Sequence, residues 1–183
     1  MTEPSASLGL SRRALLERAV LLVGGAAALS QLGACAASDA PFFSTRQMAR
    51  LDAITDIIIP ETDTPGARGA GVPAFIDGMM TNWASRETRA KFVRVLDGVD
   101  ARGRQQFDGA FLELTPDQQA ETVRLYDAEQ IAAEDDNYRQ FKQLVLLGYY
   151  HSEIGATQEL RYELVPGHWL ADVPFSQIGR AWA

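Results

Sequence analysis

Helix-start signals followed by apolar residues at helical spacing constrain the fold of this chain more than any other feature. In the segment TPDQ, Thr115 can cap a helix, Pro116 suits its first position, and Gln118 can bond back to the cap. Ser44 and Gln47 repeat this pairing ahead of apolar residues spaced three and four apart. Such signals predict a bundle of helices.

Six segments are predicted to be helical and two have no helical period. The predicted helices cover residues 45–59, 73–83, 86–101, 107–112, 116–133 and 138–155. The stretch PETDTPGARGAGVP, residues 60–73, is interrupted by prolines and glycines and must be an irregular loop. From Ala156 onward the pattern predicts an extended tail across the surface. Because no run of alternating residues recurs, the predicted fold is all-α: a small bundle of about five to six helices with a long loop and an extended C-terminal tail.

Charge and residue counts exclude several classes of function. The formal net charge of −7 argues against nucleic-acid binding, which needs a basic face. The single cysteine excludes an internal disulfide and a cysteine-rich metal or iron–sulfur site. The two histidines, His151 and His168, lie 17 residues apart and cannot form a metal-binding pair on one helix turn. The chain therefore carries little chemistry of its own.

The N-terminal segment has the pattern of an export signal. Arg12 and Arg13 precede an uncharged run from Ala19 to Ala34, which is shorter than the roughly 20 residues of a membrane-spanning helix. Paired arginines before such a run are typical of a twin-arginine signal. The alternative is the first helix of the folded domain, but this run contains glycines and has no polar face. We predict a signal over residues 1–34 and a single helical domain over residues 35–183.

The end of this signal, at Cys35, has three interpretations. The segment LGAC resembles a bacterial lipobox, in which the cysteine is lipidated and becomes the first residue. Ordinary cleavage after Ala36 also fits, because Ala34 and Ala36 are both small. An uncleaved segment would leave a weak anchor. The placement of the only cysteine at this point favours the lipoprotein, which would be held at a membrane surface.

Two features of the 60–73 loop could carry chemistry. Glu61 and Asp63, with Asp56 one helical turn earlier, could gather carboxylates for calcium binding or acid–base work. The favoured interpretation is a turn in which Asp63 and Thr64 bond to local amides. The glycines of GARGAG are typical of phosphate loops, but no strand precedes them and their spacing is not that of a dinucleotide site.

The C-terminal third offers a second group of polar and aromatic candidates. His151 and Glu153 are predicted at the end of a helix, where a histidine interacts favourably with the helix dipole. His168 and Trp169 follow a Pro-Gly turn, and docking to a partner or packing of the tail would explain them equally well. No nucleophile elbow is present. The residues therefore indicate no catalytic centre.

Three features together resemble one known family. They are the twin-arginine leader, the segment DAITDIIIPETDTPGARGAGVPAFID at residues 52–77, and the segment GYYHSEIGATQELRYELVPGHW at residues 148–169. Together they are similar to the gluconate 2-dehydrogenase subunit 3 family, also called the gamma subunit of FAD-dependent glucose and fructose dehydrogenases. The resemblance covers nearly all of the chain after the leader.

The resemblance implies a role in a complex. Members of this family assemble with a large flavoprotein of the glucose–methanol–choline type, often with a multihaem cytochrome c. The flavoprotein holds FAD and the sugar and usually lacks an export signal, so the small subunit takes the folded pair through the twin-arginine translocase to the periplasm. The chain itself would bind no cofactor. The partner-binding residues implied by the family motifs are Pro60, Glu61, Thr62, Asp63, Thr64, Pro65, Gly66, Tyr150, Pro166, Gly167 and Trp169.

Two other functions remain open from the residues alone. One is a small self-sufficient periplasmic enzyme that uses His151, Glu153 or the Glu61 and Asp63 pair. The other is a free-standing surface lipoprotein that binds a different partner.

Overall fold

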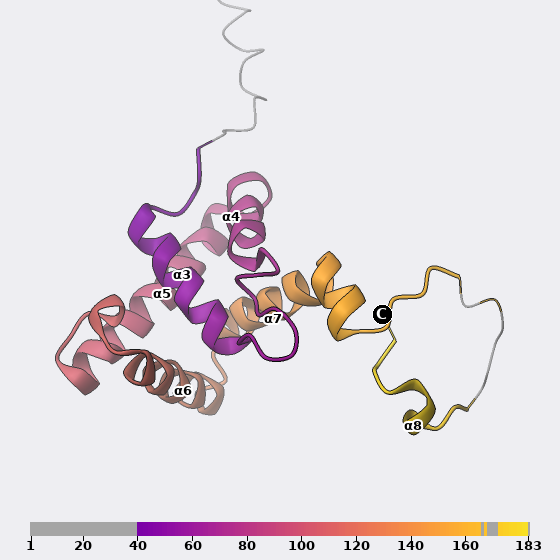
Figure 1. Ribbon diagram of the computed structural model, residues 1–183. Helices are drawn as coiled ribbons and strands as arrows, with labels where there is room; N and C mark the ends of the chain where they lie inside the picture. The colour runs from indigo at the N-terminus through magenta and orange to yellow at the C-terminus, as the bar shows by residue number, and fades with distance from the viewer. Residues whose placement is uncertain (1–39, 166, 168–171, 183) are drawn as a thin grey trace, which may run out of the picture. The chain divides into compact units, whose positions relative to one another are not determined.

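The computed structural model describes residues 40–165, 167 and 172–182, and in this part the protein is all-α, as predicted. Arg12, Arg13, Cys35, Pro166, His168 and Trp169 lie outside the described residues. Figure 1 shows the helices α3 (Thr45–Ile58), α4 (Val72–Asn82), α5 (Arg86–Phe107), α6 (Pro116–Ala132), α7 (Asp136–Tyr150) and α8 (Phe175–Ile178). None of the helices in these ranges combines the length and apolar character needed to cross a membrane.

The core lies where α5 meets its neighbours. Helix α5 packs against α3, α6 and α7, and α4 packs against α3 and α7. Each helix contributes an apolar stripe, and burying one large apolar side chain contributes about 1.5–3 kcal/mol. The largest fully buried apolar side chains are Phe111, Phe141, Leu51, Ile54, Ile76, Met80, Leu96, Val72, Val99 and Val145.

The predicted helix starts at Ser44 and Thr115 are confirmed. The Ser44 hydroxyl accepts from the Gln47 amide at 3.4 Å, and the Gln47 side chain accepts from the Ser44 amide at 3.0 Å. Thr115 and Gln118 form the same reciprocal pair. Both helices therefore begin where short-range hydrogen bonds satisfy free backbone donors.

The predicted break before residue 107 is wrong. Helix α5 runs unbroken from Arg86 to Phe107, and the short helix expected at 107–112 is a 3₁₀ turn over Phe111–Glu113. Gly103 does not interrupt α5. A Cβ there would lie 3.1 Å from Leu114, so the glycine allows the 3₁₀ turn to pack closely on the helix.

Helix α7 ends earlier than predicted. It stops at Tyr150, and the residues Gly155–Glu159 form a π-helical turn. A Cβ on Gly155 would lie only 2.0 Å from the carbonyl oxygen of Tyr149, so this glycine lets the turn fold back onto the helix end. The tail beyond it is also less extended than predicted, since it contains α8 and returns to pair Trp182 with Arg161.

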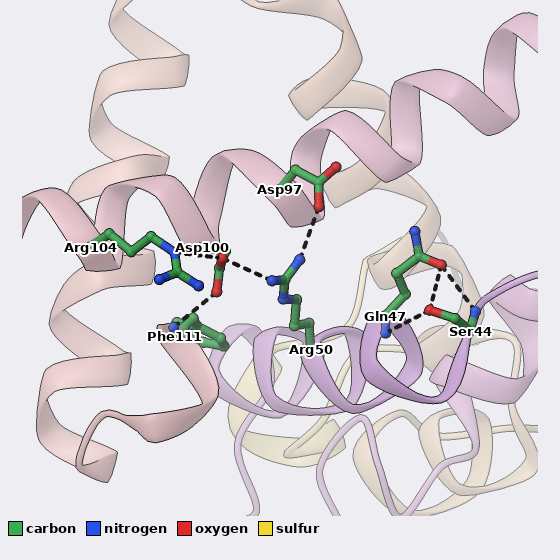
Figure 2. A network of polar contacts seen from close by, with 7 residues as sticks. All are labelled: Ser44, Gln47, Arg50, Asp97, Asp100, Arg104 and Phe111. Carbon is green, nitrogen blue, oxygen red and sulfur yellow. Dashed lines mark hydrogen bonds and ion pairs between the residues drawn. The ribbon is translucent and has the colours of Figure 1, made fainter. Parts of the chain in front are cut away.

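A polar network ties α3 to α5 inside the bundle (Figure 2). The Arg50 guanidinium lies 2.9 Å from Asp97 and 2.8 Å from Asp100, and Arg104 lies 3.1 Å from Asp100. Asp100 also accepts the Phe111 amide at 3.0 Å. Burial raises the pKa of Asp100, but the Phe111 amide and the two arginines outweigh it, so the pKa is lowered. Asp100 thus fixes the α5–3₁₀ junction as an ionised group.

Candidate functional site

The 60–73 loop is irregular, as predicted, but its backbone is tightly fixed. The Ala67 amide donates to the Ile59 carbonyl at 2.9 Å and the Val72 amide donates to the Ala67 carbonyl at 3.0 Å. A Cβ on Gly66 would lie 2.6 Å from the Ile59 carbonyl oxygen, so only glycine permits this approach. Ala67 is fully buried beneath the loop. The loop is therefore a rigid part of the surface.

The end of α7 holds this loop in place. The buried Tyr149 hydroxyl donates to the Pro65 carbonyl at 3.0 Å and lies 3.4 Å from the Thr64 hydroxyl. The Thr64 hydroxyl in turn donates to a Glu159 carboxylate oxygen at 2.7 Å. These bonds join the segments 52–77 and 148–169, which are two of the three features that carry the family resemblance. We call the Thr64, Tyr149 and Glu159 contacts the loop anchor.

The predicted local turn at Asp63 and Thr64 takes a different form. The Thr62 amide donates to the Thr64 carbonyl at 3.0 Å, but the Thr64 side chain bonds to Glu159 rather than to a nearby amide. Pro60, Glu61, Thr62 and Asp63 are exposed, Thr64 and Pro65 are half-buried, and Gly66 is buried. Thr62, Asp63 and Thr64 line an open polar cleft together with Thr157, Gln158, Glu159 and Arg180.

The candidate carboxylates of the loop do not gather into a metal site. Asp56 lies 4.0 Å from Arg68, and both side chains are exposed. No group of three or more histidine, cysteine, aspartate or glutamate residues is placed to hold a metal within residues 40–165, 167 and 172–182. The glycine segment is preceded by helix α3, and Gly71, with φ of 74°, stands directly before α4. The described residues of the 60–73 loop therefore form part of the protein surface and are not arranged as ligands around a metal ion.

His151 and Glu153 both lie at the helix end, as predicted. His151 is the C-terminal cap of α7, and its amide donates to the Leu147 carbonyl at 3.0 Å. Both side chains are exposed to solvent. Their position suits the favourable interaction of a histidine with the C-terminal end of a helix dipole. It does not provide the enclosed, water-poor setting in which acid–base groups are usually tuned.

An apolar surface on α7 was not predicted. Leu146, Leu147 and Tyr150 are exposed on the side of α7 opposite the buried Phe141 and Val145. The Tyr150 ring packs edge to face on Tyr149 at 5.3 Å, which connects this surface to the loop anchor. The run Leu144-Val145-Leu146-Leu147 contains the missed signal, because four consecutive apolar residues cannot all face one core.

The site residues predicted near the C-terminus are only partly described. Gly167 has φ of 70°, the left-handed conformation that suits glycine in a turn. Its neighbours Pro166 and Trp169 lie outside the described residues. Of the predicted partner-binding residues, the structure thus brings Thr64 and Pro65 to the end of α7, where Tyr150 is exposed beside the anchor.

Comparison with known proteins identifies the family. The model of the family described as gluconate 2-dehydrogenase subunit 3 matches residues 45–167, which begin at the first residue of α3. No curated protein and no solved structure matches the chain. The matched range contains all of the segment 52–77 and all but the last two residues of the segment 148–169. The chain therefore belongs to the gluconate 2-dehydrogenase subunit 3 family and is a small subunit of a dehydrogenase complex of that type.

Proposed function

We propose that this chain is the non-catalytic small subunit of a periplasmic, FAD-dependent sugar or sugar-acid dehydrogenase, and that it exports and stabilises the large flavoprotein subunit. The large subunit, of the glucose–methanol–choline type, would hold FAD and the substrate. A cytochrome c subunit would hold haem where one is present. Family membership supports the assignment to such a complex.

The loop anchor is the observation that carries this proposal. A buried tyrosine hydroxyl and a carboxylate hold an exposed, irregular loop rigidly against the end of α7. A loop of this length with ordered backbone is usually functional. Because Pro60, Glu61 and Tyr150 present exposed side chains around it, a preformed protein-binding surface is the best account of the arrangement.

Export explains why the small subunit would carry the leader. A flavoprotein must fold around FAD before it leaves the cytoplasm, and the twin-arginine route transports folded proteins. Arg12 and Arg13 would then serve both subunits. In the periplasm the complex would lie at a membrane surface, held through a lipid on Cys35 or through another subunit.

The test expresses the double variant Arg12→Lys/Arg13→Lys together with the flavoprotein subunit and compares the periplasmic and cytoplasmic fractions with those of wild type. We expect dehydrogenase activity and bound flavin to move from the periplasmic to the cytoplasmic fraction. Arg18→Lys, which lies in the same leader outside the pair, is the matched control and should leave the distribution unchanged. Unchanged periplasmic activity in the double variant would refute the export role.

The small-enzyme hypothesis has a separate test. It requires activity from this chain purified alone, and loss of that activity in His151→Ala. The exposed positions of His151 and Glu153 give it less support than the loop anchor gives the subunit role. A free-standing lipoprotein would instead be recovered from its host without flavin absorbance.

A further inference from the structure

Trp83 is the most exposed large apolar residue in the part of the chain that the structure describes, and its backbone is firmly held. It is 80% exposed at the corner between the end of α4 and the start of α5. The Trp83 and Ala84 amides both donate to the Met79 carbonyl, at 3.0 and 2.9 Å. A large aromatic side chain on a fixed backbone loses little freedom when a partner covers it, and tryptophan is enriched among the residues that dominate interfaces.

An apolar pocket of about 240 Å³ lies beside Trp83. An apolar cavity of about 150 Å³ can hold benzene, so this pocket can admit a further aromatic ring. The two methionines in its wall can adjust to such a ring, because methionine side chains are flexible and polarizable. The lining residues are all uncharged and come from α4, the corner after it, α5 and α7: Met79, Met80, Trp83, Ala84, Thr88, Phe92, Gln140 and Leu144.

The pocket continues into an apolar seam between α4 and α7. The two helices pack in opposite directions, because Phe75 near the start of α4 lies against Gly148 near the end of α7, whereas the end of α4 meets Leu144 at the pocket. Apolar side chains along the seam leave on the order of 500 Å² in solvent, within the range of the largest apolar patch on a typical monomer. We call them the α4–α7 face: Phe75 (37% exposed), Met79, Trp83, Leu144 and Leu147 (47% exposed).

Trp83 and the pocket adjoin on one surface, which is the arrangement that a two-fold pair of identical chains requires. In such a pair the same patch is used twice, so a projecting residue of each copy enters the hollow of the other. Because Trp83 itself lines the pocket, one two-fold axis beside it can place both indoles in both pockets. A projection and a hollow far apart on the surface would instead link copies into an open chain.

The charges around the α4–α7 face permit a second copy although the chain is acidic. Two copies with a formal charge of −7 each repel one another where their acidic side chains meet. The five residues of the face are uncharged, so they offer no carboxylate to a basic partner and no cation to anionic lipids. On the adjoining helix turns, Glu87 lies 3.0 Å from Lys91, and Asp136 lies 3.0 Å from Arg139. The face therefore suits a partner with the same uncharged surface.

We propose that the α4–α7 face pairs two copies of this chain about a two-fold axis, with Trp83 of each copy seated in the pocket of the other. The pair buries on the order of 1,000 Å² in total, at the lower end for specific interfaces, so it forms weakly, with a Kd on the order of 10 µM. This inference stands apart from the proposed function, because both partners are this chain.

Sedimentation velocity of the full chain, from tenfold below to tenfold above that Kd, tests the pairing. Trp83→Glu removes the projecting ring at an exposed position, where the fold should be unaffected, and we expect its Kd to rise at least tenfold. Gln140→Glu leaves Trp83 in place but puts a charge at the exposed rim of the pocket, and it should raise the Kd at least threefold. Ile131→Glu on α6 is the matched control: it makes the same change of charge at a residue that is 59% exposed, and its Kd should stay within twofold of wild type.

The other outcomes overturn the pairing. A wild type that stays monomeric at the highest concentration shows that no second copy binds. Every variant keeps residues 1–39, so association through that segment would give equal dimers in wild type and Trp83→Glu and would exclude the α4–α7 face as the interface. An unchanged Kd in Gln140→Glu, or an equal rise in Ile131→Glu, would mean that the pocket is not what the second copy fills. If Trp83→Glu self-associates like wild type but recovers less flavoprotein, the face binds that subunit and the two-fold pair is wrong.

Discussion

Asp100→Ala should be among the most damaging substitutions in this fold. The Asp100 carboxylate accepts three hydrogen bonds or ion-pair contacts, from the Phe111 amide and from Arg50 and Arg104 (Figure 2). Removing it leaves the Phe111 amide unpaired in the interior. It also leaves the Arg50 guanidinium, whose side chain is only 10% exposed, with Asp97 as its remaining carboxylate in this network.

The size of the effect follows from these two losses. Breaking a buried ion pair by removing one partner costs about 3–5 kcal/mol. Asp97 stays 2.9 Å from Arg50 and offsets part of that cost. The unpaired Phe111 amide adds about 1–3 kcal/mol. We expect Asp100→Ala to lower the free energy of unfolding by about 3 kcal/mol, a large fraction of the 5–15 kcal/mol of a typical domain.

Urea unfolding followed by circular dichroism measures this loss, and Asp100→Asn is the matched control. The asparagine keeps an oxygen for the Phe111 amide but loses the charge, so it should lose about half as much free energy of unfolding. The pKa of Asp100 is lowered in the folded protein, so its ionised form contributes stability above the unfolded carboxyl pKa of about 3.9. That contribution disappears as the pH falls through the lower folded pKa.

The difference in the free energy of unfolding between wild type and Asp100→Asn should therefore be constant from about pH 5 to 7 and become smaller below about pH 4. A loss under about 1 kcal/mol in Asp100→Ala would mean that the network contributes little to stability. An unchanged difference between wild type and Asp100→Asn down to about pH 3 would show that the charge of Asp100 is not what stabilises the fold.

Three further substitutions and one control test the 60–73 loop and the start of α6 by chemical denaturation. Gly66→Ala places a Cβ 2.6 Å from the Ile59 carbonyl oxygen and should lower the free energy of unfolding by about 1–3 kcal/mol. Its control, Gly78→Ala, meets nothing within 4 Å inside α4 and should raise that free energy by about 0.5–1 kcal/mol. Equal effects of the two substitutions would contradict the close approach at Gly66. Tyr149→Phe removes the bond to the loop and should cost about 0.5–1.5 kcal/mol, with faster hydrogen exchange in the 60–73 loop as its specific readout. Thr115→Ala removes a helix cap and should cost about 0.5–2 kcal/mol, and no loss would mean that the capping box is not formed in solution.

The parts of the fold that depend on neighbouring residues could be predicted from the sequence. The starts of α3 and α6 follow from hydrogen bonds spanning three residues at Ser44 and Thr115, so the local pattern determines them. The 60–73 loop was predictable for the same reason, since proline and glycine act on their own backbone. The sequence pattern alone misplaced the ends of α5 and α7. Gly103 lies within α5 and allows Leu114 to pack closely on the helix, and Gly155 allows the π-helical turn to fold back on Tyr149. Neither glycine ends the helix before it, although a glycine in such a pattern often indicates a helix end.

The candidate site could be predicted only as two separate segments. Nothing local connects Thr64 with Glu159 or Pro65 with Tyr149, because these contacts depend on the packing of α4 against α7. The exposed face of α7 was missed for a related reason. The run of four apolar residues indicates that some of them must be exposed, but the position of the neighbouring helices decides that these are Leu146 and Leu147.

The loop anchor also has a consequence for the order in which the chain is made. Its bonds join positions separated by 84 to 95 residues, so the 60–73 loop leaves the ribosome long before Tyr149 and Glu159 are synthesised. During that interval the loop lacks the two side chains that hold it. A chain arrested before residue 149 can form the loop's own backbone bonds but lacks every contact of the loop anchor. The anchored form of this surface is therefore completed only late in synthesis, after most of the helical bundle has been made.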